Sequence, residues 1–200
     1  MRRLFETLGA LALLANVAAA ANHFEGVNGD LSDNPAAPTV WALDAGNNSI
    51  TGSAGVGSLG SDYDLFTFTV PTGMQIDSVT LDSYSNPGYA SFLGLQATPT
   101  WTTGFDFGVD GDTLLGWVLF DSSYTGSNML PEMGANGGGF ATGGFTPPLG
   151  AGTYTVLLQD YATAFSYGLT FAVSAVPEPA TVGLAVFALI GVWSQRRRLK

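Results

Sequence analysis

The chain has 200 residues, enough for one ordinary domain with terminal segments, and is 46% hydrophobic and only 11% charged. Its net charge is −10, and the stretch 22–176 holds every acidic residue except Glu6 and Glu178 but no lysine or arginine. Such a stretch repels polyanions, which excludes nucleic-acid binding, and a P-loop would need a lysine. Because cysteine is also absent, the fold depends on its core or on bound ions.

The first 21 residues have the layout of a secretory signal peptide. Arg2 and Arg3 supply the charged start, an apolar run extends from Leu8 to Val17, and a run of alanines closes the segment. We therefore expect residues 1–21 to be removed on export and the mature chain to begin near Asn22.

Residues 22–175 have the pattern of an all-β domain. The part up to Leu59 is rich in loop residues, with a short strand expected at Trp41 to Leu43. Tyr63 to Val70 alternates apolar and polar side chains, which predicts a half-buried strand. The turn residues Pro71 to Gly73 then predict a hairpin with the following strand, Met74 to Leu81.

The rest of the domain continues this pattern. Ala135 to Gly144 is rich in glycine and predicts a surface loop or a disordered flap. Short strands, frequent turns and no helical stretch predict an antiparallel, jelly-roll-like β-sandwich. The further expected strands are Ser91 to Leu95, Thr113 to Phe120, Thr153 to Gln159 and Ser166 to Val173.

Three segments of the domain resemble the bacterial pre-peptidase C-terminal domain: Gly29 to Ser32, Ser61 to Gly73 and Leu149 to Tyr154. That family is a small β-sandwich appended to secreted enzymes and surface proteins, with binding or structural roles and no catalysis of its own. The resemblance implies a non-catalytic sandwich over residues 28–173.

Residue types suited to catalysis are scarce. The sole histidine, His23, lies beside the expected cleavage site, on what we expect to be a loose terminus, so a nucleophilic triad lacks its base. Zinc and copper sites lack their usual ligands, so a bound metal would be calcium held by oxygen atoms. We expect no enzyme activity. A carboxylate-dependent glycoside hydrolase stays open as a third hypothesis, because the sequence does not give the distances between carboxylates.

Two groups of aspartates are candidate calcium ligands. Asp62 and Asp64 lie on one side of a strand start, and the second group is Asp106, Asp110 and Asp112. Two close carboxylates without a cationic neighbour repel unless an ion lies between them. Solvated turn residues are the commoner explanation for such groups.

Four aromatic residues lie near the acidic loops and would suit stacking on sugar rings: Trp101, Phe105, Phe107 and Trp117. Core packing is the commoner role for such residues. A calcium-aided carbohydrate-binding module is therefore the alternative hypothesis for the domain.

The tail, residues 176–200, differs from the domain. An apolar stretch, Ala180 to Trp193, is followed by a basic cluster, which remains cytoplasmic and so leaves the domain outside. A helix of this stretch would be roughly 21 Å long, short for a hydrocarbon core of about 30 Å. The extended motif before the stretch is Pro177, Glu178 and Pro179, and the basic cluster is Arg196, Arg197 and Arg198.

This order of motif, single transmembrane helix and basic end resembles the PEP-CTERM sorting signal of Gram-negative bacteria that make exopolysaccharide. In that family exosortase, a membrane-embedded cysteine transpeptidase or protease, recognises the tail. The resemblance implies export across the inner membrane, transient membrane anchoring through the helix, and a place at the cell surface or in the extracellular matrix. We expect a structural or adhesive protein of the exopolysaccharide or biofilm. A proline-rich hinge before a permanent anchor is the plainer alternative for the tail.

Overall fold

The computed structural model describes residues 21–57, 60–86, 88, 90–136 and 143–177. Ten strands dominate this part of the chain, with short helices between them. The strands are β1 (Asn22–Phe24), β2 (Thr39–Val40), β3 (Gly46–Gly57), β4 (Gly60–Asp62), β5 (Asp64–Val70), β6 (Met74–Ser85), β7 (Ser91–Gln96), β8 (Gly116–Phe120), β9 (Gly152–Gln159) and β10 (Ala164–Ala175). The helices are α1 (Glu25–Asn28) and α2 (Leu130–Asn136), and the 3-10 turns are η1 (Asp106–Gly108), η2 (Gly111–Thr113) and η3 (Ser122–Tyr124).

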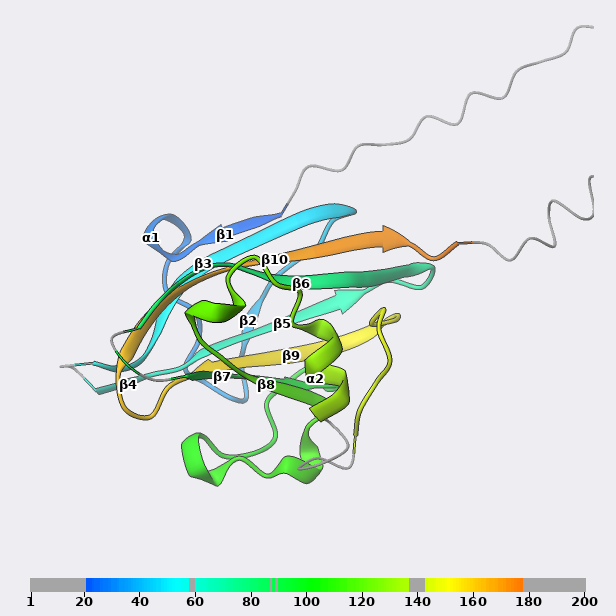
Figure 1. The fold of residues 1–200 in the computed structure, drawn as a ribbon. Coiled ribbons are helices and arrows are strands. Elements are labelled where there is room, and N and C mark those ends of the chain that lie inside the picture. The colour runs from blue at the N-terminus through cyan, green and yellow to red at the C-terminus, as the bar shows by residue number, and fades with distance from the viewer. Residues whose placement is uncertain (1–20, 58–59, 87, 89, 137–142, 178–200) are drawn as a thin grey trace, which may run out of the picture.

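The strands form two sheets of five strands, which lie as two layers in Figure 1. The first sheet has the order β1-β3-β10-β6, with β4 paired to β3, and the second has the order β2-β5-β9-β7-β8. The all-β prediction is confirmed. The prediction of purely antiparallel pairing is wrong at two edges, because β1 pairs with β3 and β2 pairs with β5 in parallel.

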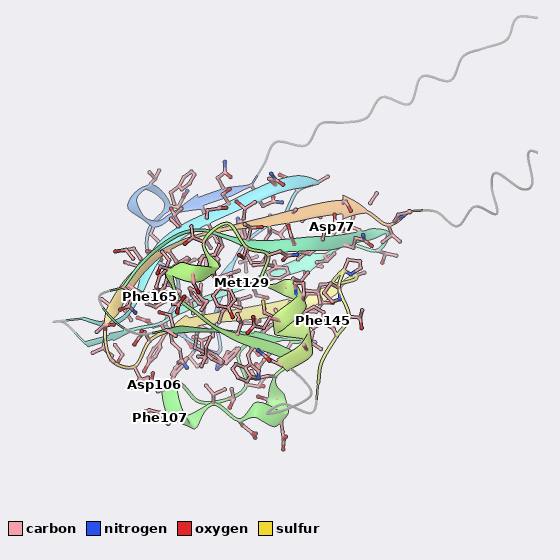
Figure 2. All side chains as sticks on the ribbon, viewed as in Figure 1. Asp77, Asp106, Phe107, Met129, Phe145 and Phe165 are labelled. Carbon is pink, nitrogen blue, oxygen red and sulfur yellow. The ribbon has the colours of Figure 1, made fainter. Side chains whose placement is uncertain are left out.

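The main core is built from buried side chains of both sheets. Strand β10 contributes alternate residues, because Tyr167, Leu169, Phe171 and Val173 point inward as a period of two requires. Figure 2 labels Phe165, a further buried residue of the same strand. The alternation predicted for this strand is therefore confirmed.

Aromatic rings meet at the centre of the main core. The ring of Phe171 on β10 makes edge contacts with Trp41, Phe66 and Phe68, at centroid distances of 5.3, 6.0 and 5.6 Å. Phe66 and Phe68 lie on β5, so these contacts join the two sheets. Edge-to-face pairs of this kind add to the free energy gained from burying the rings.

A second, smaller cluster covers the outer face of the second sheet, and we call it the outer core. Leu65 on β5 and Leu157 on β9 point outward from that sheet and pack with Trp101 and Leu114, which belong to the segment between β7 and β8. This segment is the lower green part of the ribbon in Figure 1. Strand β5 is consequently buried on both faces, and six of its seven residues are buried.

The hairpin predicted for the strands on either side of Pro71 to Gly73 is wrong. The turn forms, since Met74 N donates to the Pro71 carbonyl at 3.0 Å and Gly73 has φ +83°. It nevertheless carries the chain from one sheet to the other, because β5 pairs with β2 and β9 while β6 pairs with β10. Alternation of apolar and polar side chains on both strands does not distinguish a hairpin from two strands in facing sheets, because each strand then also has one face toward the shared core.

Strand β3 lies where the sequence predicts loop. Its glycine, serine and asparagine residues have low strand propensity, but β10 pairs with β3 along ten residues and β1 and β4 pair with it as well. Asn48, Ile50 and Ala54 point inward and are buried. Tertiary pairing thus overrides local preference.

Smaller differences concern the ends of elements. The strand expected at Trp41 to Leu43 lies earlier, in β2, and Trp41 itself follows it as a core residue. Helix α2 forms where no helix was predicted, and it includes the first two residues of the expected loop Ala135 to Gly144; residues 137–142 of that loop lie outside the described residues.

Substitution of Phe171 with alanine should lower the free energy of unfolding by about 3–5 kcal/mol, because it removes a ring that contacts three others and leaves a cavity. Urea unfolding of the mature protein, followed by tryptophan fluorescence, measures this loss. The matched control is Val40→Ala on β2, whose side chain is 81% exposed, and it should change the free energy by less than about 0.5 kcal/mol. Equal effects of the two changes would contradict this description of the core.

Candidate functional site

Asp64 is the most unusual charged residue among those described. It begins β5 and is fully buried, with a relative exposure of 0%. Its Oδ2 atom accepts a hydrogen bond of 2.6 Å from the hydroxyl of Tyr167 on β10. Its Oδ1 atom is buried and has no hydrogen-bond partner among the described residues. One oxygen therefore fixes the carboxyl group, and the other is left without a donor.

Two more carboxyl groups meet Asp64. Glu25 on α1, Asp30 and Asp64 each place an oxygen so that all three atoms lie within 4.8 Å of one another. Glu25 Oε2 accepts a hydrogen bond from Ser53 N at 2.8 Å, whereas Oε1 is buried without a partner among the described residues. We call Glu25, Asp30 and Asp64 the carboxylate cluster.

A glycine on β3 makes room for this cluster. A Cβ atom built on Gly52 would lie 2.5 Å from the carboxyl carbon of Glu25, closer than atoms can approach. The side chain of Glu25 therefore lies directly over the backbone of β3. Gly52 lowers the strand propensity of β3, but its lack of a side chain leaves the space that the carboxyl group of Glu25 occupies.

No lysine or arginine balances the charges of the cluster, since residues 22–176 contain neither. Burial, and next the charge of Glu25, raise the pKa of Asp64 to about 9. Burial, followed by the charge of Asp30, raises the pKa of Asp62 to about 6, and burial raises the pKa of Glu25. Desolvation thus disfavours the charged forms at this place.

The first predicted aspartate group is partly brought together. Asp64 is the buried member of the carboxylate cluster, and Asp62, half-buried at the end of β4, is its electrostatic neighbour. Sequence reasoning missed Glu25 and Asp30. Asp30 does lie in Gly29 to Ser32, one of the segments of the pre-peptidase C-terminal resemblance, but nothing in the sequence marked Glu25 beyond its negative charge.

The second predicted group, Asp106, Asp110 and Asp112, is not brought together as a set of ligands. Among the described residues, the carboxylate cluster is the one group of three or more whose ligand atoms lie so close. Asp110 caps η2, because its Oδ1 accepts a hydrogen bond from Asp112 N at 3.0 Å. Asp106 Oδ2 accepts one of 2.8 Å from the hydroxyl of Tyr63. Asp110 thus stabilises a turn, and Asp106 connects η1 to Tyr63.

A cleft of about 650 Å³ lies on the outer side of the second sheet. Phe107 is 86% exposed and Tyr161 is 55% exposed, and their ring centroids lie 4.8 Å apart. Figure 2 shows Phe107 on the turn below the sheet. Lining residues are Ala90, Phe92, Asp106, Phe107, Val109, Trp117, Leu119, Gln159, Asp160 and Tyr161.

Two of the four aromatic residues predicted to stack on sugars line this cleft, Phe107 and Trp117. The other two have structural positions. Trp101 belongs to the outer core, and Phe105 stacks on Tyr63 with a centroid distance of 4.1 Å. Tyr161, which sequence reasoning missed, lies in the connection after β9.

Asp160 holds the rim of the cleft in place. It is 3% exposed, and its Oδ2 atom accepts hydrogen bonds from Asn86 Nδ2 at 2.8 Å and Ser91 Oγ at 3.3 Å. Its Oδ1 atom accepts from the backbone of Ala162 at 2.8 Å and of Thr163 at 3.2 Å. Four donors thus satisfy this buried carboxylate and fix the loop that carries the neighbouring ring.

His23 is not on a loose terminus, in contrast to the prediction. It lies in β1, opposite Ile50 of β3, and its Nε2 atom is 3.2 Å from the carbonyl oxygen of Gly29. The imidazole therefore has a structural neighbour in the segment that leads to Asp30.

The described part of the chain ends just inside the predicted tail. Val176 N donates a hydrogen bond of 2.8 Å to the Gly73 carbonyl, and Val176 and Pro177 are exposed. The other motif residues, Glu178 and Pro179, the apolar stretch, Arg196 to Arg198 and the first 20 residues of the predicted signal peptide lie outside the described residues. Within the part described, no helix is long and apolar enough to cross a membrane.

Residues 175–198 match the family described as the PEP-CTERM protein-sorting motif. This match confirms the resemblance of the tail, and such a motif marks an exported protein that exosortase processes and that is anchored transiently at the membrane. The match gives no support to the pre-peptidase C-terminal resemblance of the domain, which stays a prediction. No curated protein and no solved structure is significantly similar to the chain.

Replacing Asp160 with alanine should lower the free energy of unfolding by about 2–4 kcal/mol, because four donors lose a buried charged acceptor. The control is Asp77→Ala on β6, labelled in Figure 2, whose exposed carboxylate accepts from Gln75. Urea unfolding should separate the two variants clearly. A loss no larger than that of the control would show that the Asp160 hydrogen bonds do not hold the loop.

Proposed function

We propose that this chain is an exported cell-surface or extracellular-matrix protein with a structural or adhesive role in exopolysaccharide or biofilm. The sorting motif at residues 175–198 carries the proposal, because it marks the protein as a substrate of exosortase. The motif begins at the last residue of β10, so the processing enzyme would meet an extended segment directly outside the folded domain.

The proposed arrangement has a signal peptide at residues 1–21, a β-sandwich built from the two facing sheets, and a membrane segment at Ala180 to Trp193. The basic cluster Arg196 to Arg198 would remain cytoplasmic and leave the domain outside. Two prolines beside Glu178 disfavour helix and strand and would leave the segment extended, as a protease needs. The shortness of the apolar stretch suits a temporary anchor.

A non-catalytic domain is the role that we favour. The one histidine, His23 on β1, pairs with the backbone carbonyl of Gly29. Asp64, whose raised pKa would suit a general acid, is fully buried and out of reach of a polymer substrate. A carboxylate-dependent hydrolase would need two accessible carboxyl groups on opposite sides of a sugar ring. Measurable turnover of the host polysaccharide would be required to revive that hypothesis.

Replacing Pro177, Glu178 and Pro179 together with alanine should leave export intact but keep the full-length chain in the inner membrane. The wild-type protein should lose the segment after the motif and reach the surface or the matrix. The intact mass of the protein from the native host measures both outcomes.

The control is the wild-type chain in a host without exosortase, which should behave like the alanine variant. Removing Arg196 to Arg198 should act differently, by weakening retention of the tail on the cytoplasmic side. A wild-type protein that keeps Lys200 in hosts with and without exosortase would show that the tail is a permanent anchor.

A second candidate function, calcium-aided carbohydrate binding, is favoured by the aromatic cleft. Exposed rings at Phe107 and Tyr161 offer apolar faces for sugar rings, and Gln159, Asp106 and Asp160 line the same cleft. With no lysine or arginine in residues 22–176, the cleft suits neutral or amino sugars better than acidic ones.

Phe107→Ala combined with Tyr161→Ala should weaken binding to purified host exopolysaccharide by about tenfold or more, since two stacking surfaces are lost. Val40→Ala serves as the control, because this exposed residue lies on β2, at the opposite edge of the second sheet from β8. Binding with and without a chelator tests the part of calcium. Equal binding by wild type and the double variant would show that the cleft does not bind the polysaccharide.

A further inference from the structure

We propose that Glu25, Asp30 and Asp64 bind one calcium ion. The proposal goes beyond the sorting function and does not depend on it. It rests on how three carboxyl groups from separate segments converge, on the oxygens that they leave unbonded, and on the absence of lysine and arginine from residues 22–176.

The spacing of the oxygens fits one ion. Calcium binds oxygen at about 2.3–2.6 Å, so two ligands on opposite sides of it are at most about 5 Å apart. The three ligand oxygens of the cluster all lie within 4.8 Å of one another. A single position between them can therefore satisfy all three.

The orientation of Asp64 is the independent observation. Its carboxyl group is fully buried, Tyr167 holds Oδ2 from the main-core side, and Oδ1 is the oxygen without a partner among the described residues. Glu25 repeats this arrangement, because Ser53 N holds Oε2 while Oε1 is buried and unpartnered. In each of these two side chains, one carboxyl oxygen accepts a hydrogen bond that fixes the group, and the other oxygen is available to a cation.

The chemistry of the ligands selects the ion. Carboxylate oxygens alone suit hard cations, and an irregular set of ligands from a helix, a loop and a strand suits calcium better than magnesium, which demands a regular octahedron. A lysine or arginine cannot supply the charge here, since none lies in residues 22–176. The competing explanation is a proton on Asp64, shared with Glu25.

The position of the site predicts what the ion does. Glu25 follows β1 at the edge of the first sheet, and Asp64 begins β5 of the second sheet. An ion bound by both would tie the first strand and the loop of Asp30 to the second sheet. Asp62 interacts electrostatically with the carboxyl groups of the cluster, and its negative charge adds to the attraction for the cation. The domain would then be most stable outside the cell, where calcium is available.

Thermal unfolding of the mature protein, purified from the host, tests the proposal in calcium and in a chelator. At a calcium concentration about 100 times the Kd, the melting temperature should rise by roughly 5–10 °C. Asp30→Asn is the sharpest variant, because this side chain is exposed and its loss does not disturb the core. It should weaken calcium binding, measured by titration calorimetry, by about tenfold or more.

Glu25→Gln with Asp64→Asn should remove the calcium-dependent rise altogether. The matched control is Asp110→Asn with Asp112→Asn, which removes the same number of carboxyl groups from the turn of η2 and should keep the rise. If the double variant at Glu25 and Asp64 fails to fold, calorimetry on wild type and Asp30→Asn still decides. No rise in wild type, or a loss of the rise only in the control, would overturn the proposal and leave the shared proton as the explanation.

Discussion

The structure depends on one electrostatic constraint: residues 22–176 contain many carboxylates and no lysine or arginine. Each carboxylate must therefore be solvated, accept hydrogen bonds from neutral donors, or lie beside an ion or a proton. Asp160 shows the second solution, with four donors around a buried carboxylate. Asp110 likewise accepts a hydrogen bond from a neutral donor, the backbone N–H of Asp112, at a turn. Asp64 has one donor only, from Tyr167, and that shortfall distinguishes it from the other two.

The segment between β7 and β8 covers part of the outer face of the second sheet and also helps to form the cleft. By placing Trp101 and Leu114 over Leu65 and Leu157, it buries that part of the outer face and forms the outer core. Its turn η1 then carries Phe107 to the cleft, next to the loop held by Asp160. The aromatic residues of this region thus divide into a buried set that holds the segment and an exposed set that faces solvent.

Alternation of side chains predicts the strands whose two faces differ, and β10 shows this well. It does not predict pairing, so β5 and β6 read as a hairpin although they belong to different sheets. Strand β3 escaped prediction because its pairing with β10 and β1 outweighs its composition. At the site, sequence alone indicated Asp64 but not Glu25, since only the fold brings these residues together. The tail is local in sequence, and its motif was predictable in full.

In the proposed calcium site, a cation balances the carboxylate cluster around Asp64. Long-wavelength diffraction from crystals of the mature protein grown in calcium tests it most directly, because the anomalous signal locates the ion without reference to stability. We expect one strong peak about 2.3–2.6 Å from Asp64 Oδ1, with Glu25 and Asp30 as further ligands. A map without a peak there, or with one only beside Asp110 and Asp112, would contradict it.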